Sequence, residues 1–286
     1  MLIRFTTPAI YKPEGFGCAS FGFAGSPDPK KDAAREWKEE IKGKVYSGTL
    51  DEVLKEIPAK GTCGSWQAGI VLFGNCGGEN EFMHKLYEKT GCAYTGGASA
   101  FDASTGKTGL ISGGKQAAVF MIDDPAYDIK IESENIHNNI LETHKIGFSN
   151  PRVFETIDGE DAVEWFTKKR AEFGFDASDF EHMTFSDMNN VNCHTSMSDG
   201  KLVSGRDLCE EMILRYVKKG DVYPKMNAFY NDDKAMIFGC AGLKGILEQD
   251  IMSDTMGMFM FGEVATMNGK PEFGNLMLSK IVFSRR

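Results

Sequence analysis

Three residues in the second half of the chain have side chains suited to acid–base or nucleophilic chemistry: His194, Cys240 and Glu263. Cys193 and His194 are neighbours, and a cysteine and a histidine can act as a nucleophile and its base. Adjacent residues of a strand point to opposite faces, so a partner for His194 has to come from elsewhere, such as Cys240 or Glu263. The alternative is a histidine with a purely structural role in its strand.

Glu263 is a carboxylate placed directly after an apolar run, Met258 to Phe261, and after Gly262. In this place it could bind a cationic group, act as an acid or base with a raised pKa, or accept hydrogen bonds from backbone N–H groups. A surface residue at the end of a strand is the simpler alternative. We expect a functional role, because Gly262 matches Gly96 in an earlier repeat of the same pattern.

Cys240 and Glu263 both lie in the stretch from Ala235 to Ala265. Its pattern predicts a buried strand, a turn of small residues, a helix and a second strand, in the order Ala235–Phe238, Gly239–Gly242, Leu243–Ile251 and Met258–Phe261. This order is typical of a βαβ-like unit. Gly239, at the end of the first strand, would let backbone N–H groups meet a ligand without interference from a Cβ atom.

The same pattern occurs earlier, from Gly69 to Ser99. The matching features are Phe73-Gly74 with Phe238-Gly239, Cys76-Gly77 with Cys240, Gly91 with Gly257, Gly96 with Gly262, Gly106-Lys107 with Gly269-Lys270, and Val119-Phe120 with Val282-Phe283. We therefore predict an internal duplication and an α/β (α+β) fold with two similar halves of mixed sheet. Such halves usually pack face to face, and the cleft between them is the expected ligand site.

Gly96 and Gly97 introduce a polar loop that leads to Gly106-Lys107. The loop does not fit the Walker pattern, because Asp102 stands where that pattern needs its other glycine. We expect a turn that presents Ser99 and Asp102 to the cleft. A solvated hairpin connection is the alternative.

Local patterns predict several further elements. Helices are expected at Lys30–Lys42, Thr49–Ile57 and Asp158–Phe173, strands at Lys115–Ile122, Asp128–Glu132 and Thr143–Phe148, and a hairpin turn at Ser198–Gly200. Thr49 and Glu52 form a capping box at the start of the second helix. The segment Leu208–Lys219 fits a helix and a bent strand equally well.

Composition narrows the classes of function. The net charge of −9 over 286 residues argues against nucleic acid or an anionic membrane as the main partner. No apolar run approaches the roughly 20 residues of a membrane helix, and the N-terminus lacks the apolar core of a signal peptide. The seven cysteines have neither framework nor zinc spacing, which indicates reduced thiols, a cytoplasmic protein and no metal site.

Several motifs together resemble the FIST domain, a sensory domain for small ligands. In the C-terminal half they are Phe238-Gly239-Cys240-Ala241-Gly242, Gly262-Glu263 after an apolar run, and Phe273-Gly274-Asn275; in the N-terminal half they are Gly96-Gly97-Ala98 and Asp102. The resemblance covers about residues 68 to 283. It implies a shortened FIST-N-like half at 1–127, a FIST-C-like half at 128–286, and a ligand-binding role for Asn275. Leu243 stands where the family has an arginine, so any anion binding by that arginine is in doubt.

The resemblance implies a protein that binds a small polar molecule, such as an amino acid or a carboxylate, and acts with a separate signalling partner. A chain without an output module also fits an enzyme, a hydrolase or lyase acting on a small carbonyl or carboxylate substrate. Its acid or base would be Glu263 or His194, its nucleophile Cys240, and glycine N–H groups would form the oxyanion site. One branch of the family binds haem, for which His137, His144 and His194 would be axial ligands. The chain has no CxxCH motif, and we expect no cofactor.

Overall fold

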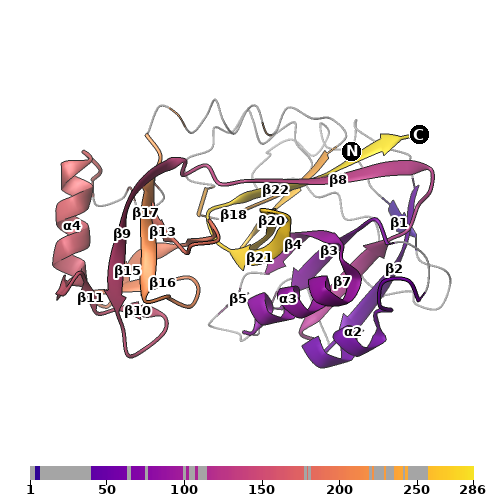
Figure 1. The fold of residues 1–286 in the computed structure, drawn as a ribbon, viewed down its shortest axis with the longest axis horizontal. Helices are drawn as coiled ribbons and strands as arrows, with labels where there is room; N and C mark the ends of the chain where they lie inside the picture. Colours follow the sequence, from indigo (N-terminus) through magenta and orange to yellow (C-terminus); the bar gives the residue numbers. More distant parts are fainter. Residues whose placement is uncertain are drawn as a thin grey trace.

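The computed structural model describes residues 4–6, 40–62, 66–74, 77–98, 101–102, 107–108, 115–176, 179, 182–218, 221, 229, 235–240, 242–243 and 257–286. In this part of the chain, mixed sheets predominate over helices, so the fold is of the predicted α+β class. Two stacked sheets form one end of the molecule, and a third region with its own small sheets forms the other (Figure 1).

The largest sheet joins seven of the described strands in the order β1–β2–β7–β3–β4–β20–β21. Helices α2 and α3 cover one of its faces, where Phe73, Phe82 and Tyr94 are fully buried (Figure 1). Burial of these rings stabilises the contact between helices and sheet. The elements are β1 Arg4–Thr6, β2 Glu40–Gly48, α2 Leu50–Glu56, β3 Ala68–Phe73, α3 Glu79–Thr90, β4 Ala93–Ala98, β7 Ala117–Ile122, β20 Glu263–Met267 and β21 Lys270–Gly274.

A second sheet of four described strands, in the order β19–β18–β22–β8, packs against the opposite face. The core between the sheets includes Ile70 and Phe120 from the first sheet and Phe238 and Ile281 from the second. The strands are β8 Tyr127–Glu134, β18 Ala235–Cys240, β19 Gly257–Met260 and β22 Leu278–Arg285.

The two sheets share one connectivity. β3 pairs parallel with β4 and antiparallel with β7, and β18 pairs parallel with β19 and antiparallel with β22. A hairpin follows each parallel pair: β5–β6 (Phe101–Asp102, Lys107–Thr108) and β20–β21. An internal duplication would produce this arrangement, and the duplication itself stays a prediction.

The sequence pattern did not predict where the second hairpin goes. Strand β20 pairs with β4, with Glu263 opposite Gly97 and Val264 opposite Gly96. The hairpin β20–β21 therefore completes the sheet of the N-terminal half. The expected segments 1–127 and 128–286 are interlocked through this exchange.

The third region lies between β8 and β18 in the sequence. Its described strands form a six-stranded sheet, β12–β11–β9–β17–β13–β14, and a three-stranded sheet, β10–β16–β15. Trp165 and Phe166 of α4 pack on Phe185 in its core. The elements are β9 Asn139–Gly147, β10 Val153–Phe154, β11 Thr156–Ile157, β12 Glu160–Asp161, α4 Ala162–Glu172, β13 Met183–Ser186, β14 Asn192–Cys193, β15 Thr195–Ser198, β16 Lys201–Ser204 and β17 Glu211–Tyr216.

Several local predictions are confirmed. Helix α2 has Thr49 as its N-cap, and the capping box with Glu52 is present. The turn at Asp199 and Gly200 joins β15 to β16, with positive φ at both residues as a type I′ hairpin requires. Asn268 and Gly269 play the same role between β20 and β21.

Two helix predictions need correction. The helix expected at Lys30–Lys42 is wrong over residues 40–42, which begin β2, because pairing with β7 and burial of Ile41 override the local pattern; residues 30–39 lie outside the described part. Helix α4 is capped by Asp161. Asp158, expected as the cap, instead begins the turn between β11 and β12, with φ of 53°.

In two further segments the structure decides between alternatives or corrects the prediction. The undecided segment after Leu208 contains β17, a strand whose register shifts between Ile213 and Arg215, so the bent-strand alternative is correct. Strand β18 continues to Cys240, which places Gly239 inside a strand and not in a turn. Most of the helix expected at Leu243–Ile251 lies outside the described residues.

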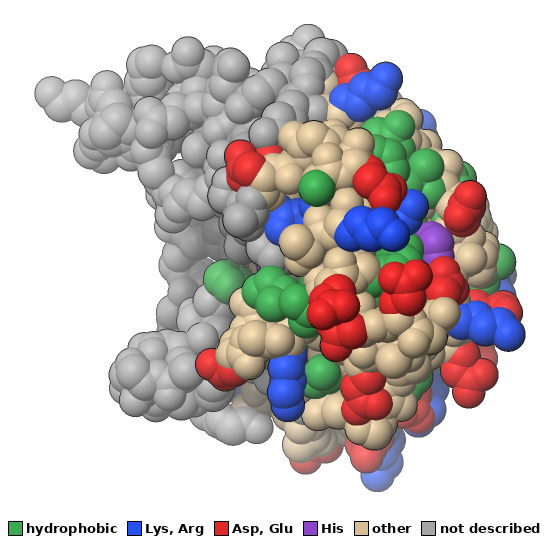
Figure 2. Space-filling model, turned by 90° about the vertical axis from the view of Figure 1, so that its left-hand side faces the viewer, with side chains coloured by type: hydrophobic (Ala, Val, Ile, Leu, Met, Phe, Trp, Pro, Cys, Tyr) green, Lys and Arg blue, Asp and Glu red, His purple; other side chains and the backbone are tan. Residues whose placement is uncertain are grey.

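The end of the molecule formed by the third region carries acidic and basic side chains that are interspersed over its described part (Figure 2). None of the helices in the described ranges combines the length and hydropathy needed to cross a membrane.

Candidate functional site

Four of the predicted site residues meet where the stacked sheets join the third region. Cys240 ends β18, Glu263 begins β20, His194 links β14 to β15, and Asn275 follows β21. A Cβ atom at Gly242 would lie 3.5 Å from Cδ2 of His194 and 3.6 Å from Sγ of Cys240, so both side chains border this glycine. The Asn275 side chain accepts a hydrogen bond from the backbone N–H of His194 at 3.2 Å.

Glu263 is fully buried, at 0% exposure. Its Oε2 accepts a hydrogen bond from the N–H of Met277 at 3.2 Å, whereas Oε1 has no hydrogen-bond partner among the described residues. Burial raises the pKa of Glu263 to about 8, against the opposing influence of the Met277 N–H and the Cys240 thiol. The carboxyl is therefore protonated at neutral pH and can donate a hydrogen bond.

Cys240 is the immediate neighbour of this carboxyl. Its thiol interacts with Glu263, although not in the geometry of a hydrogen bond to Oε1. Burial, and then the Glu263 carboxyl, raise the pKa of Cys240 well above its usual value, while the N–H groups of Leu276 and Gly242 favour the thiolate. The result is a neutral thiol, which is a poor nucleophile.

His194 is half-buried, and burial lowers the pKa of its imidazole. Its neighbour Cys193 is completely buried in the core of the third region, with Phe185 and Leu202. The side chains of Cys193 and His194 thus lie in different surroundings, as expected when successive side chains of a strand point to opposite faces. Carboxyl, thiol and imidazole are all uncharged near neutral pH, so the site offers hydrogen bonds and no ionic charge.

The loop from Gly274 to Met277 holds these groups together. Leu276 has a φ of 52°, an unusual value for a large residue. The backbone N–H of Asn275 donates to the carbonyl of Asn192 at 3.0 Å, and the Asn192 side chain donates to the carbonyl of Leu276 at 3.3 Å. Sequence reasoning missed Asn192, although the asparagine-rich run before His194 was a signal for it.

The predicted glycines have a packing role at the exchange between the sheets. A Cβ atom at Gly96 would lie 1.9 Å from the carbonyl oxygen of Val71, and one at Gly262 would lie 2.3 Å from the Phe273 ring. Both residues also have positive φ, 130° and 108°. Gly97 sits against the carbonyl of Gly262 in the same way. A role for these glycines in ligand binding stays a prediction.

For the other predicted ligand residues, Gly239, Asp102 and Ser99, the described part of the structure shows no side-chain contact with the four residues of the site. Gly239 is paired on both sides within its sheet, with Phe259 and with Leu278. Asp102 lies in β5 opposite Lys107, and its side chain is outside the described part of the structure. Ser99 is also outside the described residues.

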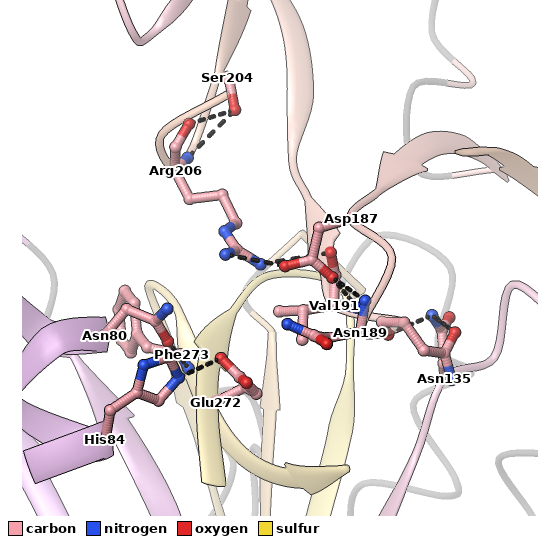
Figure 3. Close-up of polar contacts among 11 residues, drawn as sticks. Asn80, His84, Asn135, Asp187, Asn189, Val191, Ser204, Arg206, Glu272 and Phe273 are labelled. Atoms are coloured by element: carbon pink, nitrogen blue, oxygen red, sulfur yellow. Dashed lines mark hydrogen bonds and ion pairs between the residues drawn. The ribbon is translucent and has the colours of Figure 1, made fainter. Parts of the chain in front are cut away.

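A second buried carboxylate lies in the same hairpin. Glu272 is 4% exposed and its Oε2 lies at hydrogen-bond distance, 2.8 Å, from Nε2 of His84 in α3, while Asn80 accepts a hydrogen bond from the N–H of Phe273 (Figure 3). These contacts attach α3 to β21. Glu272 therefore has a side-chain partner for its carboxyl, whereas Oε1 of Glu263 has no partner among the described residues.

An open pocket of about 780 Å³ lies elsewhere, on the third region. It is lined by Lys145, Ile146, Gly147, Phe148, Cys209, Glu210 and Glu211. None of the predicted site residues is among these.

Two histidines considered as haem ligands make protein contacts. The buried His137 lies with its Nδ1 3.2 Å from the Asn192 amide, and His144 bonds to Asp158 at 2.7 Å and packs on Trp165. No group of three His, Cys, Asp or Glu within the described ranges could hold a metal ion.

Comparison with known proteins adds no relative. No model of a protein family matches the chain, and no curated protein matches it either. The resemblance to the FIST domain therefore rests on the sequence motifs and stays a prediction.

Proposed function

We propose that this protein binds a small polar molecule at the site formed by His194, Cys240, Glu263 and Asn275, and that it acts as a cytoplasmic protein of the sensory type. The observation that carries the proposal is the fully buried carboxyl of Glu263, whose Oε1 has no hydrogen-bond partner in the described structure. Buried polar atoms are almost always satisfied, and exceptions concentrate at functional sites.

The protonation state of the site indicates which ligand group would fit. A protonated Glu263 donates a hydrogen bond, so the matching ligand atom is an acceptor, such as a carbonyl or carboxylate oxygen. Leaving a buried polar group unsatisfied costs about 1–3 kcal/mol. A ligand that completes this hydrogen bond recovers that free energy. Small carboxylates and amino acids are the first compounds to test.

The test begins with a thermal-shift screen of amino acids and small carboxylates, followed by calorimetric titration of any compound that stabilises the protein. Glu263→Met should weaken binding by about tenfold or more, because it removes the donor while keeping similar volume, and hydrogen bonds to charged partners are worth about 1.5–3 kcal/mol. Glu272→Met is the matched control, because it changes the other buried glutamate of the hairpin, and it should leave the Kd unchanged. Equal affinity in Glu263→Met and wild type would show that the ligand binds elsewhere.

Proton exchange provides an independent check. A carboxylate ligand favours the protonated form of Glu263, so binding takes up protons near pH 8 and weakens as the pH rises above this value. Titrations at pH 8 in two buffers of different ionisation enthalpy measure this uptake. Proton release would instead indicate that a cationic group of the ligand pairs with ionised Glu263.

The second candidate is an enzyme that uses the same residues on a small carbonyl or carboxylate substrate. It is favoured by the pKa of Glu263, about 8, which suits a general acid or base at neutral pH. Cys240 is disfavoured as the nucleophile, because its thiol is buried and neutral. If turnover is found, Cys240→Ala should keep most of it and Glu263→Gln should remove it. Loss of turnover in Cys240→Ala alone would restore the thiol as nucleophile.

A further inference from the structure

We infer that Asn192 is a positioning residue for this site: it fixes the loop Gly274–Met277 in the conformation that turns two backbone N–H groups toward Cys240 and Glu263. The inference rests on the proposed function for its effect on ligand binding, but not for its effect on the two side chains. Asn192 itself touches neither of them in the hydrogen bonds of the described structure.

The Asn192 side chain is completely buried and held in one orientation. It exchanges two hydrogen bonds with the amide of Asn135, one in each direction, at 2.8 Å and 2.9 Å. Asn135 also donates to the side chain and the carbonyl of Asn190. Figure 3 shows Asn135 beside the turn that carries Asn189 and Val191. One hydrogen of its Nδ2 is directed to Asn135, and the other lies within reach of both Nδ1 of His137 at 3.2 Å and the carbonyl of Leu276 at 3.3 Å.

Leu276 needs such a contact because its backbone conformation is unfavourable. A large residue in the left-handed region costs roughly 1–2 kcal/mol relative to its ordinary conformations. The Leu276 side chain is fully buried against Ile237 and Leu278, so the residue cannot turn outward. The loop is therefore fixed by apolar burial on one side and by Asn192 on the other.

The conformation of Leu276 determines where the next donors point. The Met277 N–H bonds to Oε2 of Glu263, and the Leu276 N–H acts on the sulfur of Cys240. On the preceding side, Asn275 donates its N–H to the carbonyl of Asn192 and accepts from the N–H of His194. Asn192, on β14 of the third region, thereby links that region to the side chains of Cys240 and Glu263.

The test compares three variants. Asn192→Ala removes the amide, and Asn192→Asp keeps its volume and the acceptor for Asn135 but loses the donor to Leu276 and to Oδ1 of Asn135. Asn190→Gly is the matched control, because it tolerates the positive φ of 71° and removes only the outer hydrogen bond to Asn135. Because Asn192→Asp places a carboxylate among buried acceptors, urea unfolding of all three variants separates a loss of folding from an effect on the loop.

Two measurements report on the loop directly. The first is the hydrogen-exchange rate of the Met277 amide by NMR, and the second is the pH titration of the Glu263 carboxyl in ¹³C-labelled protein, assigned with Glu263→Gln. Both Asn192 variants should accelerate Met277 exchange by about tenfold or more, as expected when a local hydrogen bond opens. Asn192→Ala should also move the Glu263 titration to higher pH, because the N–H that stabilises its ionised form is lost. Asn190→Gly should change neither.

Ligand affinity, measured with a carboxylate found by the screen, separates this inference from the proposed function. An affinity about tenfold weaker in Asn192→Ala, together with the two NMR changes, supports both. If the NMR changes occur but no compound binds the wild type, the positioning role stands and the proposed function fails. If exchange and titration are the same as in the wild type for both Asn192 variants, the inference is wrong, whatever the ligand.

Discussion

Two regions predicted to contact the ligand differ in what fills them. At the exchange between the sheets, the space next to Gly96 and Gly262 is occupied by Val71 and Phe273. At the end of β18, a buried carboxyl oxygen of Glu263 has no partner among the described residues. In the first region, protein atoms fill the space that a glycine leaves open. In the second, no described atom completes the hydrogen bonding of the carboxyl.

This difference shows how to separate packing from binding in such a fold. A glycine at the end of a strand fits close approach of a ligand and close approach of another strand equally well. An unsatisfied buried acid is more specific, because packing alone gives no reason to bury it. Glu263 therefore carries more weight for function than Gly96, although the sequence pattern gave them similar standing.

The largest expected effect tests the packing role. Gly96→Ala should prevent folding or cost more than about 4 kcal/mol, because its Cβ would be forced into a backbone carbonyl that cannot move aside. Gly174→Ala is the control: Gly174 has a φ of 73° with open space around it, so only strain of about 1 kcal/mol is expected. Urea unfolding of both variants measures the difference. A well-folded Gly96→Ala protein would show that the exchange has room for a ligand.

The second prediction concerns the pH dependence of stability. The pKa of Glu263 is about 8 in the folded protein and about 4.3 in the unfolded chain. The folded state therefore binds the proton more tightly than the unfolded chain. The resulting contribution of Glu263 to the free energy of unfolding is complete below about pH 4 and is lost as the pH rises to 8. Within this window the slope from this one group is about 1.4 kcal/mol per pH unit. Glu263→Gln should remove the slope, as urea unfolding at several pH values would show; an unchanged slope would contradict the raised pKa.

A smaller effect is expected at the paired carboxylate. His84→Ala should lower the free energy of unfolding by about 1 kcal/mol, because His84 is 45% exposed and solvent screens its pair with Glu272. Ligand affinity should not change. A loss of affinity comparable with that of Glu263→Met would mean that both glutamates of the hairpin serve the site.

The smallest effect is chemical and leaves stability unchanged. Iodoacetamide at pH 7 should modify the exposed Cys209 at least about tenfold faster than Cys240, because access and thiolate content control the rate. Peptide mass spectrometry after timed quenching gives the two rates. Rapid modification of Cys240 would reveal a reactive thiolate and would favour the enzyme over the binding protein.

The sequence was informative where local rules decide the outcome. The capping box of Thr49 and the turn at Asp199 involve residues that are neighbours in the sequence. In the parallel pairs β3 with β4 and β18 with β19, the first strand is a short apolar run. The chemistry of Glu263 could also be anticipated, because a carboxylate after an apolar run is unusual. The Asn192 contacts could not, since they join residues 57 and 84 positions apart through geometry that no local pattern encodes. The pairing of β20 with β4 could not be predicted from the sequence for the same reason.

The exchange of hairpin β20–β21 also constrains how the chain can fold. Gly96 and Val264 become partners only after the 167 intervening residues have been synthesised, so this pairing has a high contact order and is expected to form slowly. Until then, the edge of β4 stays open to strands of other molecules. Nascent chains should therefore be most prone to aggregate late in synthesis, and a fragment ending near Asp124 should need the separate peptide 257–286 to become stable.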